Sequence, residues 1–415
     1  MDTGREREAA AMPPLSVAER FREEMVSWDA MLKSAFRVPP YSPDAFLIAH
    51  GGYELYDLMM TDAMVRAAIN TKRFALLSKP WSVFAASDGA VGKPSGKAIE
   101  IRDFVESSLR EIRGADGITR DFRQVLFSLM SAFFRGFSLS EVVWRLEESG
   151  KWRGKFRLAA IKSKHPRQIG FEVDDFLNIE RIVSQTPMNG RVTVPREKCL
   201  LYVYHAQEES PYGSSDLRSV YKHWWSKDTL VKFWNLHLQR FGTPMVFAQA
   251  AGDGSQILET LQAMQADASA VFPREVTPQI LQASGAGSEG FLGAVDWHNQ
   301  QIAQGILLQT LTSGEGARVG SLALGQVHFS ILLYALENAK QDIEAAINTQ
   351  LIRPLVDYNF VGAREAGLYP SFSLGNMNER DLPKLASAYD VLFKHGVVSG
   401  REPSVRELFD LPPME

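Results

Sequence analysis

The fold is decided by residues 327–351, which read VHFSILLYALENAKQDIEAAINTQL. Apolar side chains recur there every three or four positions, a spacing that predicts one long amphipathic helix. They are Leu332, Leu336, Ala339, Ile343, Ile347 and Leu351. At ~1.5 Å per residue the helix is roughly 37 Å long. Because helix propensity alone leaves such a helix marginally stable, its apolar stripe must be buried against something large.

A glycine-rich hinge precedes this helix at residues 312–321, which read TSGEGARVGS. A shorter apolar helix is predicted before the hinge, over residues 301–311. A loop of this composition between two helices is either disordered or held by its neighbours. It carries one charge of each sign, Glu315 and Arg318.

The composition is that of a protein with ample apolar residues and little net charge. With 415 residues, 45% of them hydrophobic, the chain suffices for about two or three domains. Its net charge of −4 excludes a polycation that coats nucleic acid, so any nucleic-acid contact has to be local. No run approaches the roughly eighteen apolar residues of a membrane span, and the charged N-terminus differs from a signal peptide, which together predict a soluble cytoplasmic protein.

The first two hundred residues predict an α+β unit. Helices are expected over residues 16–32, 53–77 with a break at Thr61 and Asp62, 97–112 and 118–133. Short strands bounded by Gly, Asn, Asp and Pro are expected over residues 80–86, 138–146, 156–161, 170–173, 181–183, 192–194 and 199–204. The one cysteine, Cys199, lies in an apolar run and is expected to be a small buried side chain.

A further long helix is predicted over residues 216–241. Its apolar stripe consists of Leu217, Val220, Trp224, Val231, Trp234, Leu238 and Phe241. Near the opposite side lie Arg218, Lys222, Lys232 and Arg240. This basic side is either a solvated face with extended lysine side chains or a positive stripe that faces a polyanion.

Smaller elements are predicted around the long helices. Residues 242–295 form a compact insertion, with strands over 245–250 and 279–282, a helix over 253–265 and a loop over 284–290. Pro354 is expected to end the long helix that begins at residue 327. After it, residues 369–374 are expected to return as a strand to the first unit, and residues 382–395 and 405–409 to form small helices.

Motifs for catalysis are weak or missing. Residues 285–290, GAGSEG, satisfy the G-x-G-x-x-G pattern, but they follow a short polar strand outside any βαβ repeat, so a flexible loop is expected and a nucleotide site is a remote alternative. The sequence has no phosphate-binding G-x-x-x-x-G-K-[ST], no H-E-x-x-H and no G-x-S-x-G. Its eight histidines are scattered. This pattern argues against an enzyme and predicts neither a metal nor a cofactor.

The order of several short motifs resembles the portal proteins of tailed bacteriophages and prophages, most closely the Mu-like portal group. The motifs are YELYDLMMTD at 53–62 with WSV at 81–83, FRGFSLSEVVW at 134–144, PYGSSDLR at 211–218, FGTPM at 241–245 and QLIRPLV at 350–356. The likeness covers roughly residues 45 to 400. Each motif alone has low specificity, and it is their order along the chain that makes the resemblance specific.

This resemblance implies a portal-protein fold of class α+β. It implies an N-terminal arm (1–44), an α+β wing (45–215, with 354–380 returning to it), two stem helices (216–241 and 296–311), a small α/β clip (242–295), a tunnel loop (312–325), a spine helix (326–353) and a short helical crown (381–415).

The resemblance also implies an assembly and a set of binding partners. A ring, usually of about twelve copies, would occupy one capsid vertex as a conduit for packaging and ejecting double-stranded DNA. The terminase large subunit, head–tail adaptor proteins and the major capsid protein would be its partners. The protein would reside in the virion after assembly in the host cytoplasm, with no membrane contact and no cofactor.

Candidate site residues follow from the same resemblance. The DNA-facing tunnel loop would contain Ser313, Gly314, Glu315, Gly316, Arg318, Val319 and Gly320, and the DNA-facing stem Arg218, Lys222, Lys232 and Arg240. Packing between subunits would use Trp224, Trp234, Leu332, Leu336, Ile343 and Ile347. Repetition around a ring would multiply weak charges such as Arg318, and Glu315 would temper the attraction so that DNA can pass.

Two other classes of function remain open at this point. One is a nucleotide-binding enzyme of unfamiliar type that uses residues 285–290. The other is a monomeric scaffold or adaptor whose apolar stripes are covered by partners. Light scattering separates these alternatives from a ring, because a ring has a mass near half a megadalton.

Overall fold

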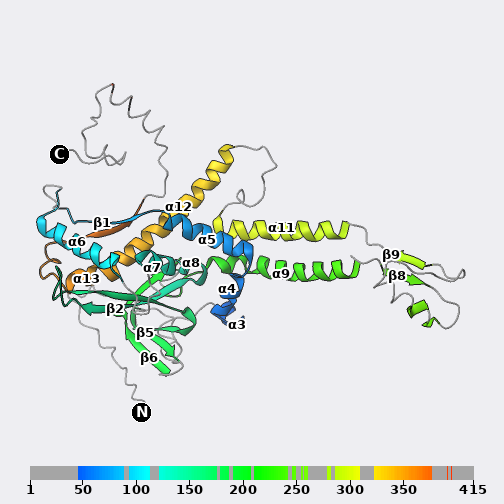
Figure 1. Cartoon of the computed structure of the whole chain (residues 1–415), viewed down its shortest axis with the longest axis horizontal. Helices are drawn as coiled ribbons and strands as arrows, with labels where there is room; N and C mark the ends of the chain where they lie inside the picture. The colour runs from blue at the N-terminus through cyan, green and yellow to red at the C-terminus, as the bar shows by residue number, and fades with distance from the viewer. Residues whose placement is uncertain are drawn as a thin grey trace, which may run out of the picture.

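The computed structural model describes residues 45–87, 93–112, 121–174, 178–186, 190–206, 210–241, 245–248, 278–281, 286–308 and 322–375, with a few single positions between 254 and 259 and at 390 and 394. A mixed helix and sheet head carries a long stalk of two helices, and a small β-hairpin lies at the far end of that stalk (Figure 1). The predicted α+β class is confirmed. The expected arm (1–44), the loop residues 312–321 and most of the expected crown lie outside the described residues.

Most described helices of the head agree with the predicted segments to within a few residues, but the helix at residues 45–49 was not predicted, and the segment predicted as one helix over 118–133 contains two. The described helices are α3 (Ala45–Ala49), α4 (Tyr53–Met59), α5 (Ala63–Leu77), α6 (Gly96–Arg110), α7 (Phe122–Leu129) and α8 (Ala132–Arg135). The predicted break at Thr61 and Asp62 is confirmed. Asp62 caps α5, because its carboxylate accepts the backbone N–H of Met64 at 2.9 Å and of Val65 at 3.1 Å.

The described part of the head also contains three antiparallel sheets. One has the order β3 (Phe156–Lys164), β2 (Phe137–Leu146), β7 (Cys199–Val203), and another the order β4 (Ile169–Val173), β5 (Ile179–Thr186), β6 (Gly190–Pro195). The third pairs β1 (Trp81–Phe84) with β10 (Ser371–Leu374). The predicted return of the chain to its first unit is thus confirmed, and Cys199 is buried as expected.

The stalk consists of α9 (Asp216–Phe241) and α11 (Ala286–Leu307), which lie side by side (Figure 1). The first has the predicted bounds, but the second begins ten residues before the predicted stem helix and replaces most of the loop expected at 284–290. Each helical glycine costs about 1 kcal/mol relative to alanine, and pairing along α9 outweighs that cost. At Gly305 the approach is so close that a Cβ would lie 2.4 Å from Val220 Cγ1.

A short hairpin follows α9 at the far end of the stalk. It pairs β8 (Met245–Ala248) with β9 (Pro278–Leu281) in antiparallel register. Dinucleotide sites of the G-x-G-x-x-G type need a parallel βαβ unit. The strand before residues 285–290 belongs to an antiparallel hairpin instead, so the fold here gives no support to the nucleotide alternative.

The long helix of the spine is longer than predicted at both ends. It comprises α12 (Leu322–Ile347), a π-helical turn η3 (Asn348–Ile352) and α13 (Arg353–Asp357), so the prediction that Pro354 ends the helix is wrong. Proline lacks an N–H and its ring clashes with the carbonyl four residues earlier in an α-helix. The wider π-turn just before Pro354, in which the N–H of Arg353 bonds Asn348 O, accommodates the ring.

Candidate functional site

The stalk begins at a buried ion pair. Asp216, the first residue of α9, accepts a hydrogen bond from Lys72 Nζ at 2.7 Å, and both side chains are less than a tenth exposed. Lys72 also donates to Tyr204 Oη at 2.8 Å, and that hydroxyl donates to Asp216 Oδ1 at 3.2 Å. Burial raises the pKa of Asp216, and Lys72 opposes that rise. The network therefore fixes the stalk to α5 and to the end of β7.

Two of the motifs quoted above meet at this base. Gly136 and Gly213 both have positive φ, 87° and 57°. A Cβ on Gly213 would lie 2.3 Å from Gly136 O, and one on Gly136 would lie 2.4 Å from Tyr212 O. Ser215 Oγ donates to Phe134 O at 2.8 Å and accepts the N–H of Leu217. Glycine is thus required at both positions, because the backbone segments at Gly136 and Gly213 cross too closely for a Cβ. This crossing determines where α9 starts.

A second buried lysine ties three helices together. Lys227 of α9 forms an ion pair with Asp62, the cap of α5, and donates to Asn299 Oδ1 of α11 at 2.9 Å. It was not among the residues selected from the sequence. Its position seven residues after Val220 could have revealed it, because that spacing places it on the buried side of the helix.

Two histidines meet one turn closer to the head than Lys227. His223 and His298 have Nδ1 atoms 3.2 Å apart, and the ring of Trp297 packs against both. Burial lowers the pKa of each histidine, and the proximity of His298 lowers the pKa of His223 further. The pair links α9 to α11.

The basic residues predicted to face DNA are spread over different surroundings. Lys222 is exposed, and Lys232 is exposed and paired with Asp228. The guanidinium of Arg218 lies 4.0 Å from the ring centre of Phe46. The side chain of Arg240 lies outside the described residues. The structure therefore brings Lys222 and Lys232 to the stalk surface, whereas Arg218 packs on the head.

The apolar stripe predicted on α9 is partly wrong. Leu217 and Val220 are buried and Trp224 is half-buried, but Val231 and Leu238 are exposed. Trp234 is half-buried. The face of α9 that contacts α11 differs slightly from the predicted stripe and includes the buried Lys227.

The stalk nevertheless leaves large apolar side chains at its surface. Their exposed fractions range from 48% at Leu292 to 57% at Phe233. These side chains are Trp225, Phe233, Leu236, Leu292 and Trp297. Exposed apolar surface of this extent on a narrow pair of helices marks an interaction site.

The predicted packing between subunits through the spine helix is wrong. Leu332, Leu336, Ile343 and Ile347 are at most 4% exposed, and all belong to the core of this same chain. The stripe packs against α5, β7 and β10, so these four side chains cannot reach a neighbouring copy. Tyr334 on α12 is 70% exposed instead. The tunnel-loop residues Ser313 to Gly320 lie outside the described residues.

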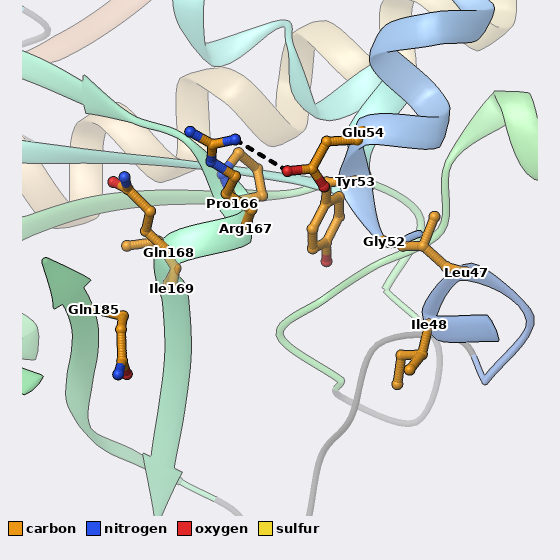
Figure 2. A pocket seen from close by; sticks show the side chains of 10 residues that line it. All are labelled: Leu47, Ile48, Gly52, Tyr53, Glu54, Pro166, Arg167, Gln168, Ile169 and Gln185. Atoms are coloured by element: carbon orange, nitrogen blue, oxygen red, sulfur yellow. Dashed lines mark hydrogen bonds and ion pairs between the residues drawn. The ribbon is translucent and has the colours of Figure 1, made fainter. Parts of the chain in front are cut away.

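One hollow of the described head is lined by residues of its first helices. It has a volume of about 690 Å³ and lies between α3, α4 and the start of β4, with Leu47, Tyr53 and Ile169 on its walls (Figure 2). Across it Arg167 donates to Glu54 at 3.0 Å, and both side chains are more than half exposed. That bond lowers the pKa of Glu54. A carboxylate held ionised by an arginine is poorly suited to act as a general acid or base at neutral pH.

The helices and the ionisable side chains of the described residues bear on two other kinds of site. None of the helices in the described residues is long and apolar enough to span a membrane. Likewise, no cluster of three or more His, Cys, Asp or Glu side chains in those residues has metal-binding geometry.

Comparisons with known proteins agree on one family. A family model described as the portal protein of Mu bacteriophage matches residues 53–411. The Mu-like prophage FluMu protein gp29 of Haemophilus influenzae is 22% identical over 350 residues, which cover 82% of this chain and 63% of that protein. The chain therefore spans less than two thirds of the length of this relative.

Solved structures show the same fold. A chain from the virion of a native gene transfer agent particle has a TM-score of 0.60 at 12% identity, covering 93% of this chain and 99% of the other. A chain from the neck of an empty particle of this kind, computed with C6 symmetry, has a TM-score of 0.58 at 13% identity, covering 88% and 95%.

Proposed function

Because the chain belongs to the family of Mu bacteriophage portal proteins, we propose that its copies close into a ring that conducts double-stranded DNA at one vertex of a capsid. The ring serves both packaging and ejection. The role is structural, and it requires no catalytic group or cofactor. The protein is accordingly a component of the virion that assembles in the host cytoplasm.

The observation that carries this proposal is the surface of the stalk. Phe233 and Leu236 on α9 and Leu292 and Trp297 on α11 are all exposed in a single chain. Covering both helices requires neighbours on both sides, which a heterologous cyclic interface provides. A monomeric adaptor would leave this surface in water unless partners covered both sides.

The charges of the two stalk helices support the proposal that each stalk is flanked by other copies of this chain. The sequence of α9 contains five Lys or Arg and two Asp, a net charge of +3, and that of α11 contains Glu289 and Asp296, a net charge of −2. When identical stalks stand side by side, α9 of one copy lies near α11 of the next, and the opposite net charges of the two helices attract each other even where the basic side chains of α9 point toward DNA. Such complementarity favours ordered association of copies.

Contact with DNA is proposed for Lys222 and Lys232, at the stalk surface, and for Arg218, Arg240 and the loop from Ser313 to Gly320. A few basic side chains per copy, repeated around a ring, attract phosphates without reading sequence. Glu315, which belongs to the same loop sequence as Arg318, weakens the attraction, so DNA slides through. If Arg318→Ala and Glu315→Ala particles package and retain DNA like the unchanged protein, the loop is not a working contact.

The parts of the chain take the family roles with adjusted bounds. Residues 45–215 and 358–380 form the wing, α9 and α11 the stem, residues 242–285 the clip, residues 312–321 the tunnel loop, α12 to α13 the spine and residues 381–415 a short crown. The terminase large subunit and the head–tail adaptor dock at the clip, and the major capsid protein surrounds the wing. About twelve copies are proposed for the capsid, and one related neck structure was computed with C12 symmetry.

Electron microscopy of particles carrying a label on this chain tests the proposal. The label is expected at a single vertex, where DNA enters. Labels spread over the capsid surface, or absent from particles that contain DNA, would refute it.

A further inference from the structure

Two imidazoles face each other across the stalk, close to its junction with the head. His223 of α9 and His298 of α11 are 75 residues apart in the sequence, yet their Nδ1 atoms are 3.2 Å apart. Their ring planes are inclined by 54°. Both side chains are half-buried and retain contact with solvent. A small dissolved ion can therefore reach them.

The separation of the nitrogens fits a shared metal ion. An ion bound tetrahedrally at about 2.0–2.1 Å from each nitrogen holds two ligand nitrogens roughly 3.3 Å apart. In the metal-free chain one Nδ1–H donates a hydrogen bond to the other Nδ1. A shift of that proton to Nε2, with rotation of the rings, would direct both Nδ1 lone pairs at one point. We infer that His223 and His298 bind one divalent transition-metal ion, Zn²⁺ or Cu²⁺, across the two helices of the stalk.

Surrounding charges leave the two rings in the form that binds metal. Burial lowers the pKa of both histidines, with further lowering by His298 and Lys222 at His223 and by Lys227 at His298. Both rings are then neutral at neutral pH, as metal ligation requires. Lys227 is paired with Asp62, so its repulsion of a bound cation is reduced. The indole of Trp297 borders both rings.

The site has two protein ligands, and water completes the coordination. No third histidine, cysteine or carboxylate in the described residues joins the pair. Imidazole ligands favour Zn²⁺, Cu²⁺ and Ni²⁺ over Mg²⁺ and Ca²⁺. The bound ion joins α9 to α11 and stiffens the stalk. The inference concerns a single chain and holds whether or not the chain forms a ring.

Titration of the full chain, freed of any affinity tag, with Zn²⁺ by calorimetry tests the inference. One Zn²⁺ per chain is expected for the unchanged protein, and none at this site in His223→Gln or His298→Gln. His237→Gln is the matched control, because His237 lies on the same helix beside Phe291 and is expected to leave binding intact. Mg²⁺ is expected to give no binding at the pair.

Cu²⁺ supplies an independent readout of the ligands. Electron paramagnetic resonance of the Cu²⁺-loaded chain is expected to show coupling to two imidazole nitrogens, reduced to one in either single variant. Thermal unfolding without metal confirms that each variant is folded. Zn²⁺ binding that persists in both histidine variants, or no Zn²⁺ binding by the unchanged chain, overturns the inference.

Discussion

The side chain of Gln350 pairs with the backbone of Leu201 as a neighbouring strand would. Its Oε1 accepts the Leu201 N–H at 2.8 Å, and its Nε2 donates to Leu201 O at 2.9 Å. Asn348 does the same with Phe372, and Asn359 with Phe156. Three carboxamides near the end of the spine helix therefore hold strands of two separate sheets, β7, β10 and β3.

We expect Gln350→Met to lower the free energy of unfolding by about 2–3 kcal/mol, because it leaves a backbone donor and acceptor of β7 unpaired. Denaturant unfolding of the single chain measures this loss. The control is Gln341→Met, at an exposed position of α12, with an expected change within about 0.5 kcal/mol. Equal effects of the two substitutions would show that the amide pairing contributes nothing.

Gly213→Ala is expected to destabilise the fold by more than about 2 kcal/mol, because positive φ and a backbone clash act together. Gly154→Ala separates the two causes, since Gly154 has φ of 82° but open space around it. That control is expected to cost only about 1 kcal/mol. Similar losses at both glycines, measured by thermal unfolding, would contradict the close crossing with Gly136.

Lys227→Met is expected to cost about 3 kcal/mol, since it leaves Asp62 largely buried without its counter-ion. Lys232→Met removes an exposed ion pair with Asp228 and is expected to change stability by at most about 0.5 kcal/mol. Urea unfolding of both variants compares them directly. If Lys232→Met lowered the free energy of unfolding as much as Lys227→Met, the contact of Lys227 with α5 and α11 would have no special role in stability.

Acid is expected to weaken the stalk. The pKa values of His223 and His298 are lowered from the ordinary 6.5, so the unfolded chain binds more protons than the folded one. The free energy of unfolding therefore falls as pH drops below about 6.5 toward the lowered values, and is fully retained above that range. Unfolding in the presence of a chelator at several pH values measures this slope.

The double variant His223→Gln, His298→Gln provides the comparison for the acid effect. Its stability is expected to depend less on pH over the same range. A residual slope is expected from His205, whose pKa burial also lowers. An unchanged slope would show that the pair does not titrate as described.

Much of the fold is predictable from local patterns. The apolar spacing from Leu332 to Leu351 indicated the long helix, and the break at Asp62 follows from a side chain that caps its own helix. Predictions that relied on one residue type were wrong where packing or a local change of helix geometry compensates for that residue. Glycine at 285, 287 and 290 indicated a loop, although pairing with α9 keeps residues from 286 onward helical. Pro354 indicated a helix end, although a π-turn accommodates it.

The site was less predictable, because its decisive contacts join distant segments. Lys72 and Asp216 are 144 residues apart, and no local spacing relates them. The sequence showed that Leu336 and Ile343 must be buried, but not by what, and the same chain covers both. Sequence patterns thus identified the stalk helix α9 and its basic residues, while the exposed apolar surface of the stalk became evident only in the structure.

The mass of the assembled protein tests the central proposal most directly. Mass photometry of the purified chain is expected to show rings near half a megadalton, about twelve copies of 46.3 kDa. The pair Phe233→Asp and Trp297→Asp is expected to yield folded monomers, and Ile99→Asp on the head to leave rings intact. Rings that persist in the variant with both stalk substitutions would contradict the account. So would particles that contain DNA and in which the unchanged chain forms no ring.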